Sequence, residues 1–151
     1  MNESNIITLF VVQIVSICSA IRTNEGAYTK IGSKYYYIEM EKKLMWSTAL
    51  EKCQILGGHL AHLESEKELA AISEHLDQGK WYWVDITDVK SEGEYVSSTT
   101  NRQASFFRWM DGDPNNKNNN EHCVHLIYYK SKFFMNDLAC DSTISYICEM
   151  D

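Results

Sequence analysis

The sequence predicts a single α+β domain, and three observations lead to this class. Two segments in the first half of the chain carry apolar residues at helical spacing, and segments with the alternation of strands follow them. Helices followed by several strands are typical of the α+β class. The chain has 151 residues, of which 44% are apolar, and this apolar mass is enough for one sizeable core but not for two domains.

The first expected element is a strand within residues 26–40, where an aromatic run follows a Gly-Ser pair. The next is a helix over residues 46–56, which ends at the stop signal Gly57-Gly58. A second helix is expected over residues 65–76, because Ser65 and Glu68 have the spacing of a capping box at its start. These three elements occupy the first half of the domain.

Three further strands are expected over residues 81–86, 124–129 and 144–148. The intervening residues 97–122 contain few β-branched residues and a tract rich in Asn and Asp. A loop of ~25 residues inside a compact domain tends to be either functional or disordered. Functional residues are therefore sought first in this loop.

Residues 1–20 have the pattern of a secretory signal peptide, with an apolar run that ends in small residues at Ala20. The run is too short to span a bilayer, although Glu3 and the lack of Lys or Arg depart from the usual pattern. A membrane anchor and a buried N-terminal helix are the alternatives. Cleavage would remove Cys18 from the five cysteines and leave an even number, which is typical of a secreted protein with two disulfides. Residues 21–151 would then form the mature domain, and three cysteine pairings remain open.

The composition argues against several classes of function. The net charge is −7, and no stripe of Lys and Arg is present to neutralise phosphates, so a nucleic-acid partner is not expected. No activated nucleophile is apparent, and a glycosidase pair made of Asp113 and Glu121 would need an apolar pocket that this polar loop lacks. The domain is therefore expected not to be an enzyme.

The histidines and tryptophans are expected to be structural. His59 and His62 form a His-x-x-His pair without the glutamate of a zinc-protease helix, and the other histidines near possible ligands are His122 and His125. A zinc site built from them is the less favoured interpretation. The aromatic residues Trp81, Trp83 and Trp109 are expected in the core rather than on a sugar-stacking surface.

The loop and the segment after it contain five side chains with oxygen donors, which are Asp113, Asn115, Glu121, Asn136 and Asp137. Hard oxygen ligands of this number and charge suit Ca²⁺, which takes ~6 to 8 oxygens. The alternative is a solvated Asn-rich loop without a ligand. If Cys123 pairs with Cys140, however, Glu121 must lie near the Asn-Asp pair, and a calcium site becomes the favoured hypothesis.

Several motifs resemble the C-type lectin-like domain family over nearly the whole mature chain. In chain order, the matching pieces are the helix that ends at Cys53 with Gly57-Gly58-His59-Leu60-Ala61, then Trp83-Val84-Asp85-Ile86, Trp109, Asp113-Pro114-Asn115, Glu121, Cys123, Asn136-Asp137, Cys140 and Cys148. Each motif alone is weak, but their common order and spacing are specific. The chain looks most like the short form found in secreted insect lectins.

The resemblance implies a fold with two helices, small antiparallel sheets, a long polar calcium-binding loop and two disulfides, Cys53–Cys148 and Cys123–Cys140. It also implies a cis peptide before Pro114 and a Ca²⁺ ion held by the five oxygen donors named above. The sugar itself would contact four of them: Asp113, Asn115, Glu121 and Asn136. The implied function is a secreted, calcium-dependent lectin without a membrane span that binds glycans on glycoproteins or microbial surfaces.

The acid-Pro-amide order around Pro114 resembles lectins that bind mannose, glucose or fucose rather than galactose. The alternative function is a C-type lectin-like module that binds a protein partner without sugar. The sequence specifies neither the natural glycan nor an oligomeric state.

Three residues depart from the family pattern. Asp113 stands where the family has Glu, which shortens the carboxylate by one methylene and is expected to weaken binding. Met135 replaces a Trp and is expected to change only packing, whereas Asp85 replaces a Gly with no reason apparent in the sequence. A second family calcium site would use Asp88, Glu92, Asn116 and His122. It is expected to be absent or poor, because histidine is not a calcium ligand.

Overall fold

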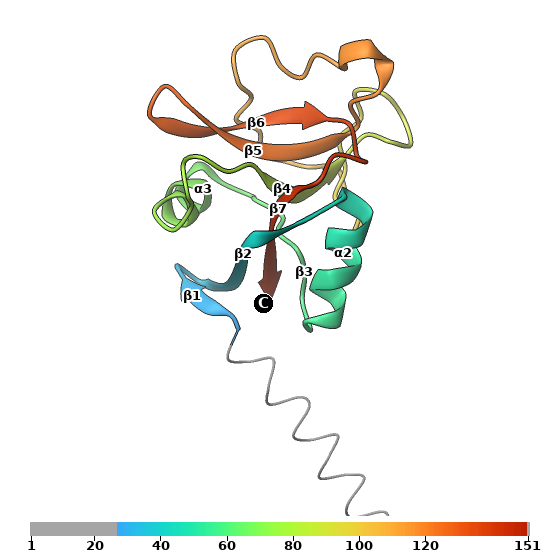
Figure 1. The fold of residues 1–151 in the computed structure, drawn as a ribbon. Helices are drawn as coiled ribbons and strands as arrows, with labels where there is room; N and C mark the ends of the chain where they lie inside the picture. Colours follow the sequence, from blue (N-terminus) through green and yellow to red (C-terminus); the bar gives the residue numbers. More distant parts are fainter. Residues whose placement is uncertain (1–26, 151) are drawn as a thin grey trace, which may run out of the picture.

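A computed structural model describes residues 27–150 and confirms the α+β class (Figure 1). The elements in chain order are β1 (Thr29–Ile31), β2 (Lys34–Leu44), α2 (Trp46–Ile55), β3 (His59–Leu60), α3 (Glu66–Ser73), β4 (Tyr82–Thr87), the 3-10 turn η1 (Lys117–Asn119), β5 (Cys123–Tyr129), β6 (Lys132–Leu138) and β7 (Ile144–Met150). The signal peptide expected over residues 1–20 lies outside the described residues. Within residues 27–150, no helix has the length and apolarity needed to cross a bilayer.

The two predicted helices are present, and both are slightly shorter than expected. Helix α2 buries Trp46, Ala49 and Cys53, which are among the apolar positions that predicted it. Helix α3 begins after Ser65, whose hydroxyl accepts the backbone N–H of Glu68 at 3.2 Å. The capping box is not reciprocal, because the Glu68 carboxylate accepts the N–H of Glu64 at 2.8 Å. A capping box would pair the Glu68 carboxylate with the N–H of Ser65, so this hydrogen bond is made one residue earlier than the motif predicts.

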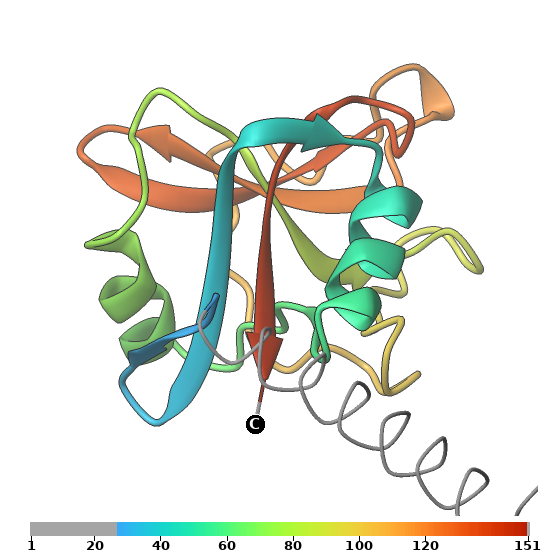
Figure 2. The same cartoon turned by 60° about the horizontal axis from the view of Figure 1, so that its bottom comes forward.

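The strands form one connected sheet in the order β1-β2-β7-β4-β5-β6, with β3 paired to β7. The sequence analysis expected small antiparallel sheets, but β4 and β7 pair in parallel and join the two halves into one sheet. Figure 2 shows α3 and α2 on opposite sides of the β2–β7 pair. Strand β6 was not predicted as a closing strand, because two polar residues, Asn136 and Asp137, interrupt its apolar pattern.

Strand β4 is buried along its whole length and separates two clusters of core residues. Tyr82, Val84 and Ile86 belong to one cluster, whereas Trp83 belongs to the other, as expected for side chains that alternate between the faces of a strand. Two disulfides reinforce the fold. Cys53–Cys148 joins α2 to β7, and Cys123–Cys140 joins the start of β5 to the segment after β6.

The tryptophans expected in the core, Trp81, Trp83 and Trp109, occupy different environments. Trp83 is fully buried and its indole N–H donates to the carbonyl of Leu44 at 2.9 Å, and Trp109 is half-buried against the core. The core prediction is wrong for Trp81, whose side chain is 43% exposed. Trp81 precedes β4, and its ring lies 5.0 Å from that of the buried His125. It covers the core rather than entering it.

Candidate functional site

The segment before the Asn-rich tract is held against β6 by backbone pairing. The N–H of Met135 donates to the carbonyl of Arg108 at 2.6 Å, and the N–H of Met110 donates to the carbonyl of Met135 at 2.9 Å. The Met135 side chain itself is fully buried in the core, so its expected packing role is confirmed. This pairing places the beginning of the tract next to the strand that carries Asn136 and Asp137. In Figure 1 the loop lies beyond the β5–β6 hairpin.

The repeated asparagines of the loop match its backbone conformation. Asn116, Asn118 and Asn119 have φ values of 40°, 59° and 54°, which place them in the left-handed region. Asparagine adopts this region more readily than other residues that carry a side chain. The tract therefore forms a defined turn, η1, that returns the chain to β5.

Asp137 organises the loop from β6. Its side chain is buried, and its two carboxylate oxygens accept the backbone N–H of Asn115, each at 3.0 Å. One of these oxygens also accepts the N–H of Asn116 at 2.6 Å. The peptide between Asp113 and Pro114 is cis, and the Asn115 side-chain amide donates to the Asp113 carboxylate. The structure thus brings Asp113, Asn115 and Asp137 together.

Glu121 closes the same cluster from the end of the loop. Its carboxylate accepts the N–H of Lys117 at 3.1 Å, and its own N–H donates to the Asn116 side-chain carbonyl at 3.1 Å. Burial raises the pKa of Glu121 and also the pKa of Asp113, and the negative charge of Asp137 raises both further. Asp137 therefore adds negative charge near both carboxylates. A bound cation would relieve this repulsion.

Asn136 supplies an unsatisfied acceptor. Its side-chain carbonyl oxygen is buried and has no hydrogen-bond partner within residues 27–150. A buried acceptor without a partner costs roughly 1–3 kcal/mol. The five predicted residues all offer oxygen atoms, which suit a hard cation such as Ca²⁺. The only contacts described for Asn136 are those of its strand.

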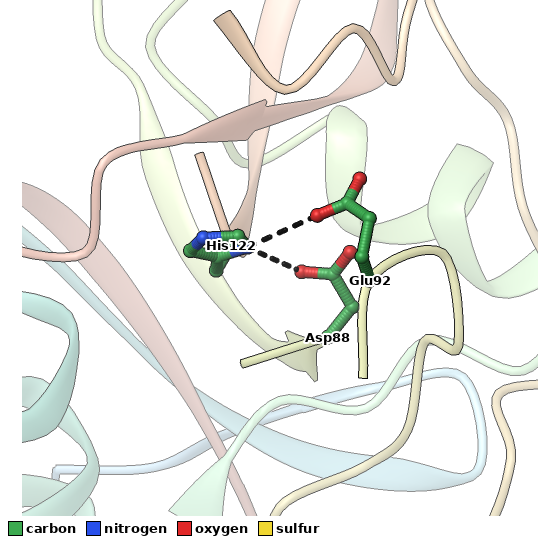
Figure 3. Close-up of side chains that lie close together, drawn as sticks. All are labelled: Asp88, Glu92 and His122. Carbon is green, nitrogen blue, oxygen red and sulfur yellow. Dashed lines mark hydrogen bonds and ion pairs between the residues drawn. The ribbon is translucent and has the colours of Figure 1, made fainter. Parts of the chain in front are cut away.

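A second cluster lies at the end of β4, where the sequence analysis expected a calcium site to be absent or poor. It contains the carboxylates of Asp88 and Glu92 and the ring of His122 (Figure 3). His122 Nδ1 lies 3.2 Å from Asp88 Oδ1 and 3.4 Å from Glu92 Oε2. The side-chain amide of Asn116 donates to Glu92 at 2.5 Å. Asn116 therefore contacts both clusters.

The remaining histidines do not join a metal-binding group. Among the described residues, the one group of three or more His, Cys, Asp or Glu side chains with converging donor atoms is the cluster just described. His59 lies 3.7 Å from the buried Glu149, and His62 Nδ1 lies 3.3 Å from the carbonyl of Asp85. His125 is fully buried in the core. These three histidines are structural, as the sequence analysis expected.

Asp85 has a structural role that the sequence did not reveal. Its carboxylate is fully buried and accepts a hydrogen bond from the Ser97 hydroxyl at 2.7 Å. It also accepts the backbone N–H groups of Ser98 at 3.0 Å and Thr99 at 3.2 Å. Asp85 therefore fixes the start of the long loop to β4. The adjacent Ser-Ser-Thr-Thr segment, with its small hydroxyl side chains, is the signal that could have indicated such a turn.

Comparison with known proteins identifies the family. Residues 42–150 match the family described as "Lectin C-type domain", and the chain belongs to this family. It is 39% identical over 122 residues to C-type lectin 37Db of Drosophila melanogaster, a match that covers 81% of each chain. It is also 34% identical over 114 residues to salivary C-type lectin 1 of Aedes albopictus, which covers 69% of this chain and 74% of the relative. Membership confirms the resemblance and the expectation that the domain is not an enzyme.

The fold agrees with that assignment. A solved C-type lectin domain of murine dendritic cell inhibitory receptor 2, in complex with N-glycan, superposes with a TM-score of 0.76 at 23% identity. The match covers 83% of this chain and 96% of the other. At this identity the comparison establishes the fold alone.

Proposed function

We propose that this chain is a secreted, calcium-dependent lectin, and that Asp113, Asn115, Glu121, Asn136 and Asp137 hold the ion. The observation that carries the proposal is the pair of residues on β6, where Asp137 accepts the backbone N–H groups of the loop that carries the other ligands, and the neighbouring Asn136 has a buried side-chain oxygen without a partner among the described residues. Family membership supports glycans as the ligand class. The insect lectins among its relatives, one of them salivary, support secretion, with residues 1–20 as the leader and residues 21–151 as the mature domain.

Each residue has a separate task in this proposal. The buried Asp137 fixes the backbone of Asn115 and Asn116, so the loop is oriented before a ligand arrives. Bound calcium would supply coordination positions for two sugar hydroxyls. The carboxylates of Asp113 and Glu121 would accept hydrogen bonds from those hydroxyls, and the side-chain amides of Asn115 and Asn136 would donate hydrogen bonds to the hydroxyl oxygens. Because the loop is already held, little ordering is required on binding.

The preferred sugars follow from the order of acid and amide around Pro114. Asp113 accepts and Asn115 donates, and their side chains contact each other, so both can face one pair of neighbouring hydroxyls. This order, acid before amide, favours equatorial 3- and 4-hydroxyls, as in mannose, glucose and N-acetylglucosamine, and the equivalent pair in fucose. The short Asp113 side chain reaches less far than a glutamate and is expected to lower the affinity.

Calorimetric titration with Ca²⁺, and then with methyl mannoside or methyl galactoside, tests the proposal. The expected result is calcium-dependent binding of the mannoside, at roughly millimolar affinity because a single sugar makes few contacts. Asn136→Ala is expected to abolish calcium and sugar binding, because it removes the unpartnered oxygen. Asp111→Asn, which alters an exposed acid of the same loop that pairs with Lys130, is the matched control and is expected to bind normally.

Three results would contradict different parts of the proposal. Calcium binding without any sugar response would favour the alternative module that binds a protein partner. Calcium binding that persists in Asn136→Ala would show that the ion is held elsewhere. Galactoside binding without a mannoside signal would overturn only the interpretation of the acid-Pro-amide order.

A further inference from the structure

The cluster formed by Asp88, Glu92 and His122 collects its donors from three places in the fold. Asp88 follows β4, Glu92 lies in the next loop, and His122 precedes β5, and Figure 3 shows both carboxylates directed at the His122 ring. One donor atom from each residue lies within 4.8 Å of the other two. Three donors from separate segments therefore face one point.

The cluster carries buried negative charge that lacks a permanent positive partner. The Asp88 side chain is fully buried, and its second oxygen accepts the N–H of Gly93 at 2.8 Å. Within residues 27–150, no Lys or Arg forms an ion pair with Asp88 or Glu92, and His122 is their only basic partner. A buried carboxylate without a compensating charge is strongly disfavoured. The cluster therefore favours the binding of a positive ion.

The donor types select which ion fits. Calcium requires roughly six to eight oxygen ligands, whereas this cluster offers an imidazole nitrogen and two carboxylates. Zinc takes nitrogen and carboxylate ligands at about 2.0–2.1 Å, so that ligands of a tetrahedral site lie roughly 3.3–3.4 Å apart. The two distances from His122 Nδ1, 3.2 Å and 3.4 Å, match this spacing. The hydrogen bond from the Asn116 amide orients Glu92, as outer-shell groups of metal sites do.

We propose that Asp88, Glu92 and His122 form a zinc site that is separate from the proposed calcium site. Three protein ligands leave a fourth tetrahedral position for water. The zinc site does not depend on sugar binding, because none of its three ligands belongs to the sugar-binding set. The presence of His122 thus changes the metal that this cluster accepts, rather than only weakening a calcium site.

The test is a calorimetric titration of the metal-free, full-length protein with Zn²⁺ in the presence of excess Ca²⁺. The expected result is one equivalent of zinc that calcium does not displace. His122→Gln and Glu92→Gln are each expected to lower zinc affinity by roughly 100-fold or more, because loss of a direct ligand exceeds the usual outer-shell effect. Glu92 is exposed, so its variant tests the site without disturbing the core. His75→Gln changes an exposed histidine outside the cluster and is expected to bind zinc normally.

A third variant tests the choice of metal. His122→Asp replaces nitrogen with oxygen, and it is expected to lose zinc and to gain a second equivalent of calcium. The ring nitrogen of His122 should also shift on zinc addition in a ¹⁵N NMR spectrum of the wild-type protein. The proposal is overturned if no zinc binds, if His122→Gln binds it as tightly as the wild type, or if calcium displaces it.

Discussion

Asp85 shows how a single buried side chain can hold a functional loop in place. Its carboxylate satisfies one hydroxyl and two backbone N–H groups of residues 97–99, so the loop leaves the core at a fixed point. The Ser97 side chain is buried, so leaving its hydroxyl unpaired is costly. The residue therefore contributes to stability without contacting either proposed metal.

Asp85→Ala is expected to lower the free energy of unfolding by about 2–4 kcal/mol, because it removes a fully buried acceptor of three hydrogen bonds and leaves the buried Ser97 hydroxyl without this partner. Urea denaturation followed by tryptophan fluorescence measures this loss. The matched control is Asp111→Ala, an exposed acid, which is expected to change the free energy by less than about 0.5 kcal/mol. Equal values for the two variants would show that the hydrogen bonds of Asp85 contribute nothing net.

His125 makes the stability of the domain depend on pH. Its ring is fully buried beside Trp81 and Trp83, and burial lowers its pKa from 6.5 to about 4. Between these two values the unfolded chain binds more protons than the folded one. The stability contribution of the neutral ring is therefore present above pH 6.5 and is lost as the pH falls toward 4. The full loss amounts to about 3 kcal/mol.

His125→Phe is expected to flatten this part of the pH dependence, because a ring that cannot be protonated takes the same apolar place. Urea unfolding at about pH 7.5 and about pH 4.5, with a chelator present, compares the variant with the wild type. His75→Gln, at an exposed position, is expected to retain the wild-type slope. If His125→Phe also retained it, the acid sensitivity would originate elsewhere.

At the scale of elements, the Cys123–Cys140 disulfide connects the two halves of the proposed calcium site. Cys123 follows Glu121 closely, and Cys140 follows the Asn136-Asp137 pair on β6. The double variant Cys123→Ala/Cys140→Ala is expected to bind calcium more weakly, because Glu121 is no longer tied to β6. Removing a bridge that closes a loop of this length also lowers the free energy of unfolding by about 3 kcal/mol, because the unfolded chain regains conformational entropy.

Calorimetry with Ca²⁺, on samples that circular dichroism shows to be folded, measures this effect. The wild-type protein serves as the reference at the same temperature. Unchanged calcium affinity in the double variant would show that the β5–β6 pairing alone holds the site together. That result would leave the disulfide with a role in stability only.

Elements with a strong apolar period were predictable from the sequence, and those with polar interruptions were not. Helix α2 was found from its buried positions, Trp46, Ala49 and Cys53, because they recur at helical spacing. Strand β6 was missed because Asn136 and Asp137 occupy it. The parallel β4–β7 pairing was also missed, since residues far apart in sequence meet there and no local pattern encodes the contact.

The candidate site shows the same division. The oxygen-bearing side chains were recognisable from residue type alone, and Asp137 and Asn115 do lie together. The hydrogen bonds from the backbone of Asn115 and Asn116 to the Asp137 carboxylate were not predictable. Their donors are backbone N–H groups, which every residue except proline carries. His122 was identified in the sequence as a poor calcium ligand. The resemblance had already grouped His122 with Asp88 and Glu92, but the distances between their donor atoms came only from the fold.

At the scale of the whole molecule, the redox state of the cysteines reports on processing of the chain. Both disulfides lie within the described residues, and Cys18 lies outside them. If residues 1–20 are removed on secretion, the mature protein has no free thiol. Thiol titration of the denatured, secreted protein is expected to give none, and mass spectrometry is expected to show a chain that begins at Ile21. A titratable thiol on an intact chain would contradict the signal peptide.

The position of β7 determines when the molecule can fold. This strand is the last in the described chain, yet it pairs with β2, β3 and β4 and carries Cys148, the partner of Cys53. Ribosomes add about 5–20 residues per second, so the earlier elements wait for seconds with their central partner missing. The sheet of this domain can therefore close only after β7 has been synthesised. A premature stop codon within residues 144–150 would thus remove the middle of the sheet, not its edge.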